Sequence, residues 1–257
     1  MKHLHSNVIG EGKQDLIVLH GFLGMGDNWK SHAKFLASKG LKVHLIDQRN
    51  HGRSFWSNEF NYNLLVHDLL EYMNYNNILE PIIMGHSMGG KTAMQFSFMF
   101  SNRIKKLIII DIAPKKYIPR HDKILKGLSE LDFNIIKSRN KADHQLIKYV
   151  PEIEVRQFLL KNLYWKTKDE LALRFNISVL KDSSIEINNE LFTKNFFIKP
   201  TLFLKGENSD YIKNEDLNLI EKYFPKCKIK TISRAGHWLH VENQKDFLSE
   251  IMVFLNC

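Results

Sequence analysis

The chain of 257 residues has only two cysteines, Cys227 and Cys257, which gives it no disulfide framework and fits a reducing compartment. It also lacks a long apolar segment, because runs such as 107–110 are far shorter than the roughly 20 residues that cross a bilayer. Residues 1–15 contain no apolar core of a secretory signal. These absences predict a cytoplasmic protein that does not insert into a membrane.

Several kinds of chemistry are missing from the sequence. The 12 histidines include no HExxH pattern, and there is no CxxC pair, so no metal site is expected. Gly10 and Gly12 are too close together and badly placed to form a phosphate-binding loop. We therefore expect a protein that needs no metal and no cofactor.

The formal net charge of +9 raises the possibility of an anionic partner, such as nucleic acid. However, the lysines are scattered, and no arginine-rich arm or basic strand with aromatic residues is present. With 44% hydrophobic and 25% charged residues, the composition is that of an ordinary globular protein. We interpret the charge as a lysine-rich solvated surface and expect no nucleic-acid partner. Nothing in the sequence indicates an oligomeric state.

Apolar strand-like runs alternate with helical stretches, which is typical of parallel βαβ units. Strands are expected at 16–20, 42–47, 82–85, 106–111, 200–205 and 228–232, after a short strand pair within 3–9. Helices are expected between them, at 28–38, 64–75, 88–100, 214–223 and 243–255. This order predicts an α/β fold with a mostly parallel eight-stranded sheet and helices on both faces.

The alternation of strand-like and helical segments stops between residues 115 and 197, where the sequence becomes helical and basic. Helices are expected there at 121–131, 142–150 and 152–163, with Pro151 as a break. We interpret 115–197 as a helical lid inserted after strand six of a single domain, whose core is 1–114 and 198–257. The alternative is that these helices pack on the faces of the sheet.

The segment 81–94, PIIMGHSMGGKTAM, turns a short apolar strand into a helix. Gly85, Ser87 and Gly89 have the spacing of a nucleophile elbow. A turn this sharp forces the serine into a strained backbone conformation, and the residues two positions away must lack a Cβ so that strand and helix do not collide. Ser87 is therefore the candidate nucleophile.

A serine nucleophile needs a base, and the base needs an orienting acid. His237 follows the last expected strand, and Gly236 gives its turn the freedom to project the imidazole. Two acids remain possible. Asp111 ends strand six, whereas Asp210 lies in the loop after strand seven, one residue later than the usual place of the acid, which Ser209 holds. We favour Asp111 and keep Asp210 as the alternative.

An oxyanion hole needs two backbone amides. The turn at 20–24 supplies one, with Phe22 as the expected donor and Leu23 as the fallback, and the Met88 amide supplies the other. Side chains expected to contact the substrate are Leu23, His86, Phe158, Leu159, Leu163, Trp165 and Trp238. Those in the lid could equally pack the lid onto the core.

Five segments together, GHSMGGKTAM, HGFLGMGDNW, DQRNHGRS, IDIAPKKY and GHWLHVEN, make the chain resemble the YbfF-type esterases of the α/β-hydrolase superfamily nearly end to end. The resemblance implies the α/β-hydrolase fold, a helical lid between strands six and seven, and an acid after strand six, which is Asp111. It also implies hydrolysis of acyl esters, with acyl-CoA thioesters among the substrates. The loop after strand seven often has no acid in that family, whereas Glu207 and Asp210 are present here.

We therefore expect a carboxylesterase or thioesterase that acts on a small-molecule acyl ester or thioester through an acyl-enzyme at Ser87. The alternatives are other serine chemistry on the same fold, such as hydrolysis or lysis of a C–C bond or perhydrolysis, and a ligand receptor without turnover. Haloalkane dehalogenases and epoxide hydrolases need Asp at the nucleophile position, so Ser87 excludes them.

The expected lid is basic. Residues 115–170 contain 13 Lys and Arg against 8 Asp and Glu, a surplus of five positive charges. Such a surplus could attract an anionic leaving group, for example the phosphates of CoA. The alternative is that the lysines only keep an exposed helical segment soluble.

Overall fold

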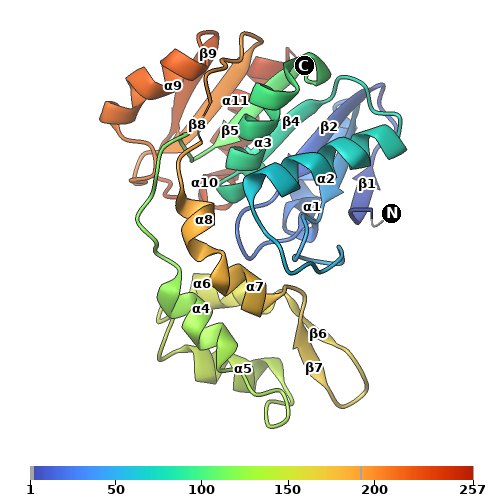
Figure 1. Ribbon diagram of the computed structural model, residues 1–257, viewed down its shortest axis with the longest axis vertical. Helices are drawn as coiled ribbons and strands as arrows, with labels where there is room; N and C mark the ends of the chain where they lie inside the picture. Colours follow the sequence, from blue (N-terminus) through green and yellow to red (C-terminus); the bar gives the residue numbers. More distant parts are fainter. Residues whose placement is uncertain (1–2, 192, 257) are drawn as a thin grey trace.

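The computed structural model describes residues 3–191 and 193–256, which form a sheet flanked by helices (Figure 1). In these residues the sheet has seven strands in the order β1-β3-β2-β4-β5-β8-β9. The strands are β1 (Ser6–Ile9), β2 (Gln14–Leu19), β3 (Leu41–Ile46), β4 (Ile82–His86), β5 (Lys106–Ile110), β8 (Thr201–Gly206) and β9 (Cys227–Ile232). Only β1 is antiparallel to its neighbour, β3. The predicted mostly parallel sheet is confirmed.

The number of strands differs from the prediction by one. The strand pair expected within 3–9 is wrong, because the described part of that segment holds the single strand β1. Two strands of three residues joined by a two-residue turn already need about eight residues, which is more than this segment offers. The sheet therefore has seven strands within the described residues instead of eight.

Helices cover both faces of the sheet. Successive side chains of a strand point to opposite faces, so each face buries its own apolar cluster. Ile17 and Leu19 belong to the same apolar cluster as buried residues of α2 (Tyr62–Tyr75), α3 (Met88–Met99) and α9 (Leu217–Tyr223). Leu16 and Val18 belong to the cluster that includes buried residues of α1 (Lys30–Ser38) and α11 (Gln244–Leu255). Shorter helical turns are η1 (Gly26–Trp29), η2 (Ser101–Arg103), η3 (Asn214–Asp216) and α10 (Leu239–Glu242).

Between β5 and β8 the chain leaves the sheet and lies beyond one end of it, in the lower half of Figure 1. We call residues 115–197 the insertion. Its elements are α4 (Asp122–Ser129), α5 (Arg139–Leu146), α6 (Ile153–Leu160), β6 (Leu163–Trp165), β7 (Leu171–Leu173), α7 (Ile177–Asp182) and α8 (Ser184–Asn188). The apolar cluster under α3 continues into the insertion through Leu125, Leu159 and Leu180. The insertion thus shares a core with one face of the sheet.

The three helices predicted in the insertion exist as α4, α5 and α6, and each is shorter than expected. The helix predicted over 152–163 ends at Leu160, and β6 then pairs with β7 in an antiparallel hairpin that the sequence analysis missed. Strands of three residues are too short for an alternating pattern to stand out. No helix of the described part of the chain is both long and apolar enough to span a membrane.

Candidate active site

Ser87 lies between β4 and α3, with a φ of 52° and a ψ of −116°, a conformation that residues with a side chain rarely adopt. The flanking glycines make the turn possible. A Cβ on Gly85 would lie 2.2 Å from the carbonyl oxygen of Gly89, and a Cβ on Gly89 would lie 2.3 Å from that of Leu19. The Ser87 amide donates to the carbonyl oxygen of Ile110 at 3.1 Å, which ties the turn to β5. The predicted steric role of the two glycines is confirmed.

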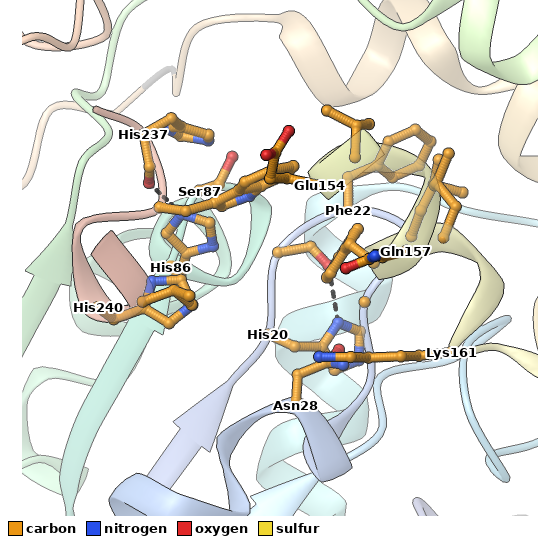
Figure 2. Close-up of a pocket in the computed structure, with 18 of the residues that line it drawn as sticks. His20, Phe22, Asn28, His86, Ser87, Glu154, Gln157, Lys161, His237 and His240 are labelled. Carbon is orange, nitrogen blue, oxygen red and sulfur yellow. Dashed lines mark hydrogen bonds between the residues drawn. The ribbon is translucent and has the colours of Figure 1, made fainter. Parts of the chain in front are cut away.

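Asp111 follows β5, is fully buried and has a φ of 49°. Its Oδ1 accepts a hydrogen bond from the Gly206 amide at 3.1 Å. Its Oδ2 accepts from the Ser209 hydroxyl and from Nδ1 of His237, the latter at 2.8 Å. Because a carboxylate only accepts, the proton of a neutral His237 lies on Nδ1, and Nε2 is left as an acceptor. Ser87 and His237 line the same cavity (Figure 2).

Asp210 has a different partner. Its two carboxylate oxygens accept hydrogen bonds from Nη1 and Nη2 of Arg120, at 2.6 and 2.7 Å. Bonding to this guanidinium lowers the pKa of Asp210, although both side chains are about half exposed. The structure therefore separates the two candidate acids, because Asp111 contacts His237 whereas Asp210 contacts the insertion.

The amides of Phe22 and Met88 have no protein acceptor among the described residues, so both are available to a ligand. The fallback donor, Leu23, is already used, because its amide donates to Nε2 of His51 at 3.2 Å. Burial lowers the pKa of His51 to about 3, so its ring is neutral and can accept this bond. The expectation that Leu23 could replace Phe22 as oxyanion donor is therefore wrong.

Uncharged histidines support the loop that carries His237. Nε2 of His86 donates to the carbonyl oxygen of His237 at 3.0 Å. His240 stacks on Trp29, with ring centroids 4.2 Å apart, and its carbonyl oxygen accepts from Nε2 of His32 at 2.8 Å. Burial holds the pKa values of His86 and His240 well below the ordinary value, so these rings stay neutral.

The imidazole of His237 also stacks on Tyr211, with ring centroids 3.6 Å apart and planes 12° from parallel. The Tyr211 amide donates to the Ser209 hydroxyl oxygen at 3.3 Å, and its carbonyl oxygen accepts from the Tyr117 hydroxyl at 2.8 Å. The guanidinium of Arg120 lies over the same ring, 5.4 Å from its centroid. Tyr211 therefore restrains the plane of the imidazole while Asp111 restrains its rotation.

The cavity at Ser87 has a volume of about 280 Å³. Figure 2 shows Ser87, His86 and His237 on one side of it and Gln157 and Lys161, from the end of the insertion helix α6, on the other. Five of the seven predicted substrate contacts line it: Leu23, His86, Phe158, Leu159 and Trp238.

The other two predicted contacts, Leu163 and Trp165, do not line this cavity. Leu163 packs in the apolar core, and Trp165 is 54% exposed on the hairpin. The helix predicted over 152–163 ends at Leu160, and both residues lie in β6. The change from helix to strand points these side chains away from the site.

The sequence analysis missed several residues at the site. These are His20, Asn28, His121 and His240, Lys161 at the end of α6, and Tyr211 beside His237. His20 and His240 lie in the segments that carry the resemblance, but no spacing rule singles them out. Tyr211 directly follows Asp210 and has no signal of its own.

The comparisons with known proteins agree with this fold. A family model described as the alpha/beta hydrolase fold matches residues 16–140. Esterase YbfF of Escherichia coli is 32% identical over 94% of this chain and 92% of that esterase. The sn-1-specific diacylglycerol lipase ABHD11 of Danio rerio is 34% identical over 95% of this chain and 80% of that lipase. The chain belongs to the α/β-hydrolase family.

The solved structure of a marine microorganism esterase superposes on the chain with a TM-score of 0.96 and 39% sequence identity. The match covers 99% of this chain and 100% of that esterase. The resemblance to YbfF-type esterases found in the sequence is confirmed. Because these relatives are esterases and lipases, they support a hydrolase that acts on ester bonds.

Proposed function

We propose that the chain is a serine hydrolase that cleaves carboxylic esters or acyl thioesters, acyl-CoA included, through a Ser87–His237–Asp111 triad. The observation that carries the proposal is the 2.8 Å contact between His237 Nδ1 and Asp111, beside a serine in the strained elbow conformation. The ion pair of Asp210 with Arg120 supports Asp111 as the acid.

In the acylation step, Ser87 Oγ attacks the acyl carbonyl carbon, and Nε2 of His237 takes the proton of the Ser87 hydroxyl. The carbonyl oxygen becomes an oxyanion, which accepts hydrogen bonds from the Phe22 and Met88 amides. Asp111 stabilises the imidazolium that forms. As the tetrahedral intermediate collapses, the bond from carbon to the leaving oxygen or sulfur breaks, and His237 returns its proton to the leaving group.

Deacylation repeats these steps with water. His237 Nε2 takes a proton from a water molecule, whose oxygen attacks the Ser87 ester. The same two amides bind the second oxyanion, and the proton passes to Ser87 Oγ as the carboxylic acid leaves. Each step uses only the chain's own groups and water.

The insertion is proposed to act as a lid over this site. Phe158, Leu159 and Lys161 line the cavity from it, so the insertion shapes the space in which the substrate lies. Its surplus of positive charge supports a thioester of CoA as one substrate, since CoA carries phosphates. The scarcity of cysteine supports a cytoplasmic location.

Replacement of Ser87 by Ala tests the proposal. Ser87→Ala removes the nucleophile, and we expect turnover of 4-nitrophenyl esters and acyl-CoA to fall by about 10⁴-fold or more. A serine-reactive phosphonate should inactivate the wild-type enzyme and add its mass to Ser87. Unchanged thermal unfolding would show that the variant is folded, and turnover that survives in the folded variant would refute the proposal.

A further inference from the structure

The turn that carries Phe22, one of the two proposed oxyanion donors, holds a residue in an unfavourable backbone conformation. The Gly24 amide donates to the carbonyl oxygen of Gly21 at 3.0 Å, so residues 21–24 form a four-residue turn with Leu23 as its third residue. Leu23 has a φ of 59°, which lies in the left-handed region. A turn with this φ at its third residue usually has glycine there, because a Cβ disfavours positive φ. The turn by itself therefore does not favour the conformation that it has.

The side chain of Leu23 explains why glycine is not used. It is 1% exposed, belongs to the apolar cluster of the core and lines the cavity at Ser87. Glycine would relieve the backbone strain, but it would leave this part of the cavity wall empty. Strained residues of this kind persist only where the surrounding structure holds them, and they occur often at functional sites. The groups that hold Leu23 are therefore of interest for the site.

Both backbone polar groups of Leu23 are held by side chains from outside the turn. Its amide donates to Nε2 of His51 at 3.2 Å, and its carbonyl oxygen accepts from Nδ2 of Asn162 at 3.0 Å. His51 lies in the loop that follows β3, whereas Asn162 lies in the insertion, between α6 and β6. Because the two bonds lie on either side of the Leu23 Cα, its backbone cannot leave the left-handed region without breaking one of them.

Asn162 is itself fixed in place. It is fully buried, its Nδ2 also donates to the carbonyl oxygen of Leu159 at 3.1 Å, and its own carbonyl oxygen accepts from the Arg174 amide at 2.9 Å. Both side-chain contacts are made to carbonyl oxygens, which only accept, so the amide nitrogen must face them. Oδ1 of Asn162 has no partner among the described residues. A buried acceptor without a partner is costly, so the two donated bonds are what this side chain contributes here.

We propose that Asn162 is a positioning residue, which together with His51 holds Leu23 in the left-handed conformation and so directs the Phe22 amide toward the oxyanion. The residues that line the cavity at Ser87 do not include Asn162, so Asn162 acts through Leu23 and not on the substrate. This inference rests on the proposed esterase or thioesterase function and adds to it a part for the insertion in the rate of the reaction.

Asn162→Leu tests the inference, because leucine is close to asparagine in shape and cannot donate. We expect kcat on a 4-nitrophenyl ester to fall by about 10- to 100-fold, since a misplaced oxyanion donor weakens binding of the transition state. KM should change by less than about threefold, because the bond to the oxyanion is made only in the transition state. Asn195→Leu is the matched control. Nδ2 of Asn195 also joins the insertion to a carbonyl oxygen of the core, that of Phe98, at 3.0 Å, at the far end of α3 from Ser87. Asn195→Leu should leave kcat and KM unchanged.

A double-mutant cycle with Leu23→Gly shows whether Asn162 acts through Leu23. Glycine adopts a positive φ without support from other residues, so in the Leu23→Gly background Asn162→Leu should lower kcat by less than about threefold. Leu23→Gly also changes the cavity, so kcat is compared only within each background. Thermal unfolding shows whether each variant is folded. If Asn162→Leu does not fold, Asn162→Ala, which adds no bulk, takes its place in both backgrounds.

The outcomes separate this inference from the function on which it rests. If the wild type cleaves no ester, or if Ser87→Ala retains turnover, the proposed function fails and the inference falls with it. If cleavage depends on Ser87 but a folded Asn162 variant keeps kcat within about threefold of the wild type, the function stands and the inference is overturned. An equal loss of kcat in both backgrounds would also overturn it, because Asn162 would then support the fold in general. A rise in KM with kcat unchanged would overturn it as well, because Asn162 would then act on substrate binding.

Discussion

The charged contact at the carboxyl edge of the sheet and the ion pair that links this edge to the insertion differ in their burial. At the sheet edge, Asp111 is fully buried and accepts from Gly206, Ser209 and His237. The side chain of Arg120, from the insertion, is 47% exposed, and that of its partner Asp210, from the loop after β8, is 55% exposed. Solvated ion pairs contribute at most about 1 kcal/mol each, whereas loss of one partner from a buried charged network costs several.

This difference separates the tasks of the two regions. The proposed triad is fixed mainly by backbone turns and buried hydrogen bonds of the core, and the insertion reaches it through Tyr117 and Arg120, which contact Tyr211. The insertion supplies part of the wall of the cavity at Ser87, for example Ile124 and Phe158. Substitutions at the sheet edge should therefore change the rate, and substitutions of these wall residues should change the choice of substrate.

The two carboxylates give the largest expected contrast. Asp111→Asn replaces an acceptor by an amide that can donate to His237 Nδ1, which favours the wrong imidazole tautomer, and kcat should fall by about 10³–10⁴-fold. Asp210→Asn removes only a solvated ion pair with Arg120, so kcat should fall by less than about tenfold. Steady-state kinetics on one 4-nitrophenyl ester measures both. The opposite ranking would move the acid to Asp210, and similar intermediate losses would mean that the two carboxylates share the role.

The second expected effect concerns Lys91, which lies where the core contacts the insertion. Lys91 of α3 is 1% exposed and donates to the carbonyl oxygens of Asn188 and Asn189 at the end of α8. Burial lowers its pKa from 10.5 to about 7. At a pH between about 7 and 10.5, Lys91 is protonated in the unfolded chain and deprotonated in the folded chain, so the unfolded state binds more protons. The Lys91 contribution to the free energy of unfolding therefore rises with pH through this window and is lowest below pH 7.

Lys91→Met removes this titration. Relative to the variant, the wild type should gain about 2 kcal/mol in free energy of unfolding between about pH 6 and about pH 9. Urea denaturation of both proteins at the two pH values measures the difference. Lys168→Met, in the exposed turn between β6 and β7, is the control and should show no such change. A constant difference between Lys91→Met and the wild type would mean that Lys91 stays charged in the folded chain.

The sequence predicted the parts of the site that local rules determine. Ser87 is predicted as the nucleophile because a sharp turn needs Gly85 and Gly89, and in the structure a Cβ on either glycine would lie within 2.3 Å of a backbone oxygen. Asp111 and His237 are predicted as acid and base because parallel strands bring their carboxyl ends to one edge of the sheet, whichever helices connect them. The ends of the strands therefore predict where Asp111 and His237 lie, even though some predicted helix bounds differ from the structure by several residues.

The cavity walls depend on packing between distant segments, which no local pattern records. Leu163 and Trp165 were misplaced because the helix before them ends three residues early and the chain becomes a strand. Tyr211 reaches His237 only because β8 and β9 are neighbours in the sheet. The choice between the two acids likewise needed distances across the fold, namely 2.8 Å from Asp111 to His237 and 2.6 Å from Asp210 to Arg120 of the insertion.

The smallest expected effect concerns the charge of the insertion. Of its surplus cations, Lys161 lies at the cavity beside Ser87 and has no ion-pair partner among the described residues. Steering by such charges weakens as the Debye length shortens from about 30 Å at about 0.01 M salt to about 10 Å at about 0.1 M. We expect kcat/KM for an acyl-CoA to fall several-fold over this range, while a neutral ester with the same acyl group barely changes.

Lys161→Gln tests whether the steering charge lies at the cavity. It should reduce the salt response of the acyl-CoA and leave the neutral ester unaffected. Lys168→Gln removes the same charge from the exposed hairpin of the insertion and should reduce the salt dependence of kcat/KM for the acyl-CoA less than Lys161→Gln does. If the two variants lower the response equally, the insertion attracts the substrate as a whole and Lys161 has no special part. If wild-type rates for both substrates respond alike to salt, the positive charge of the insertion is a solvated surface, and the proposal of CoA thioesters loses its electrostatic support.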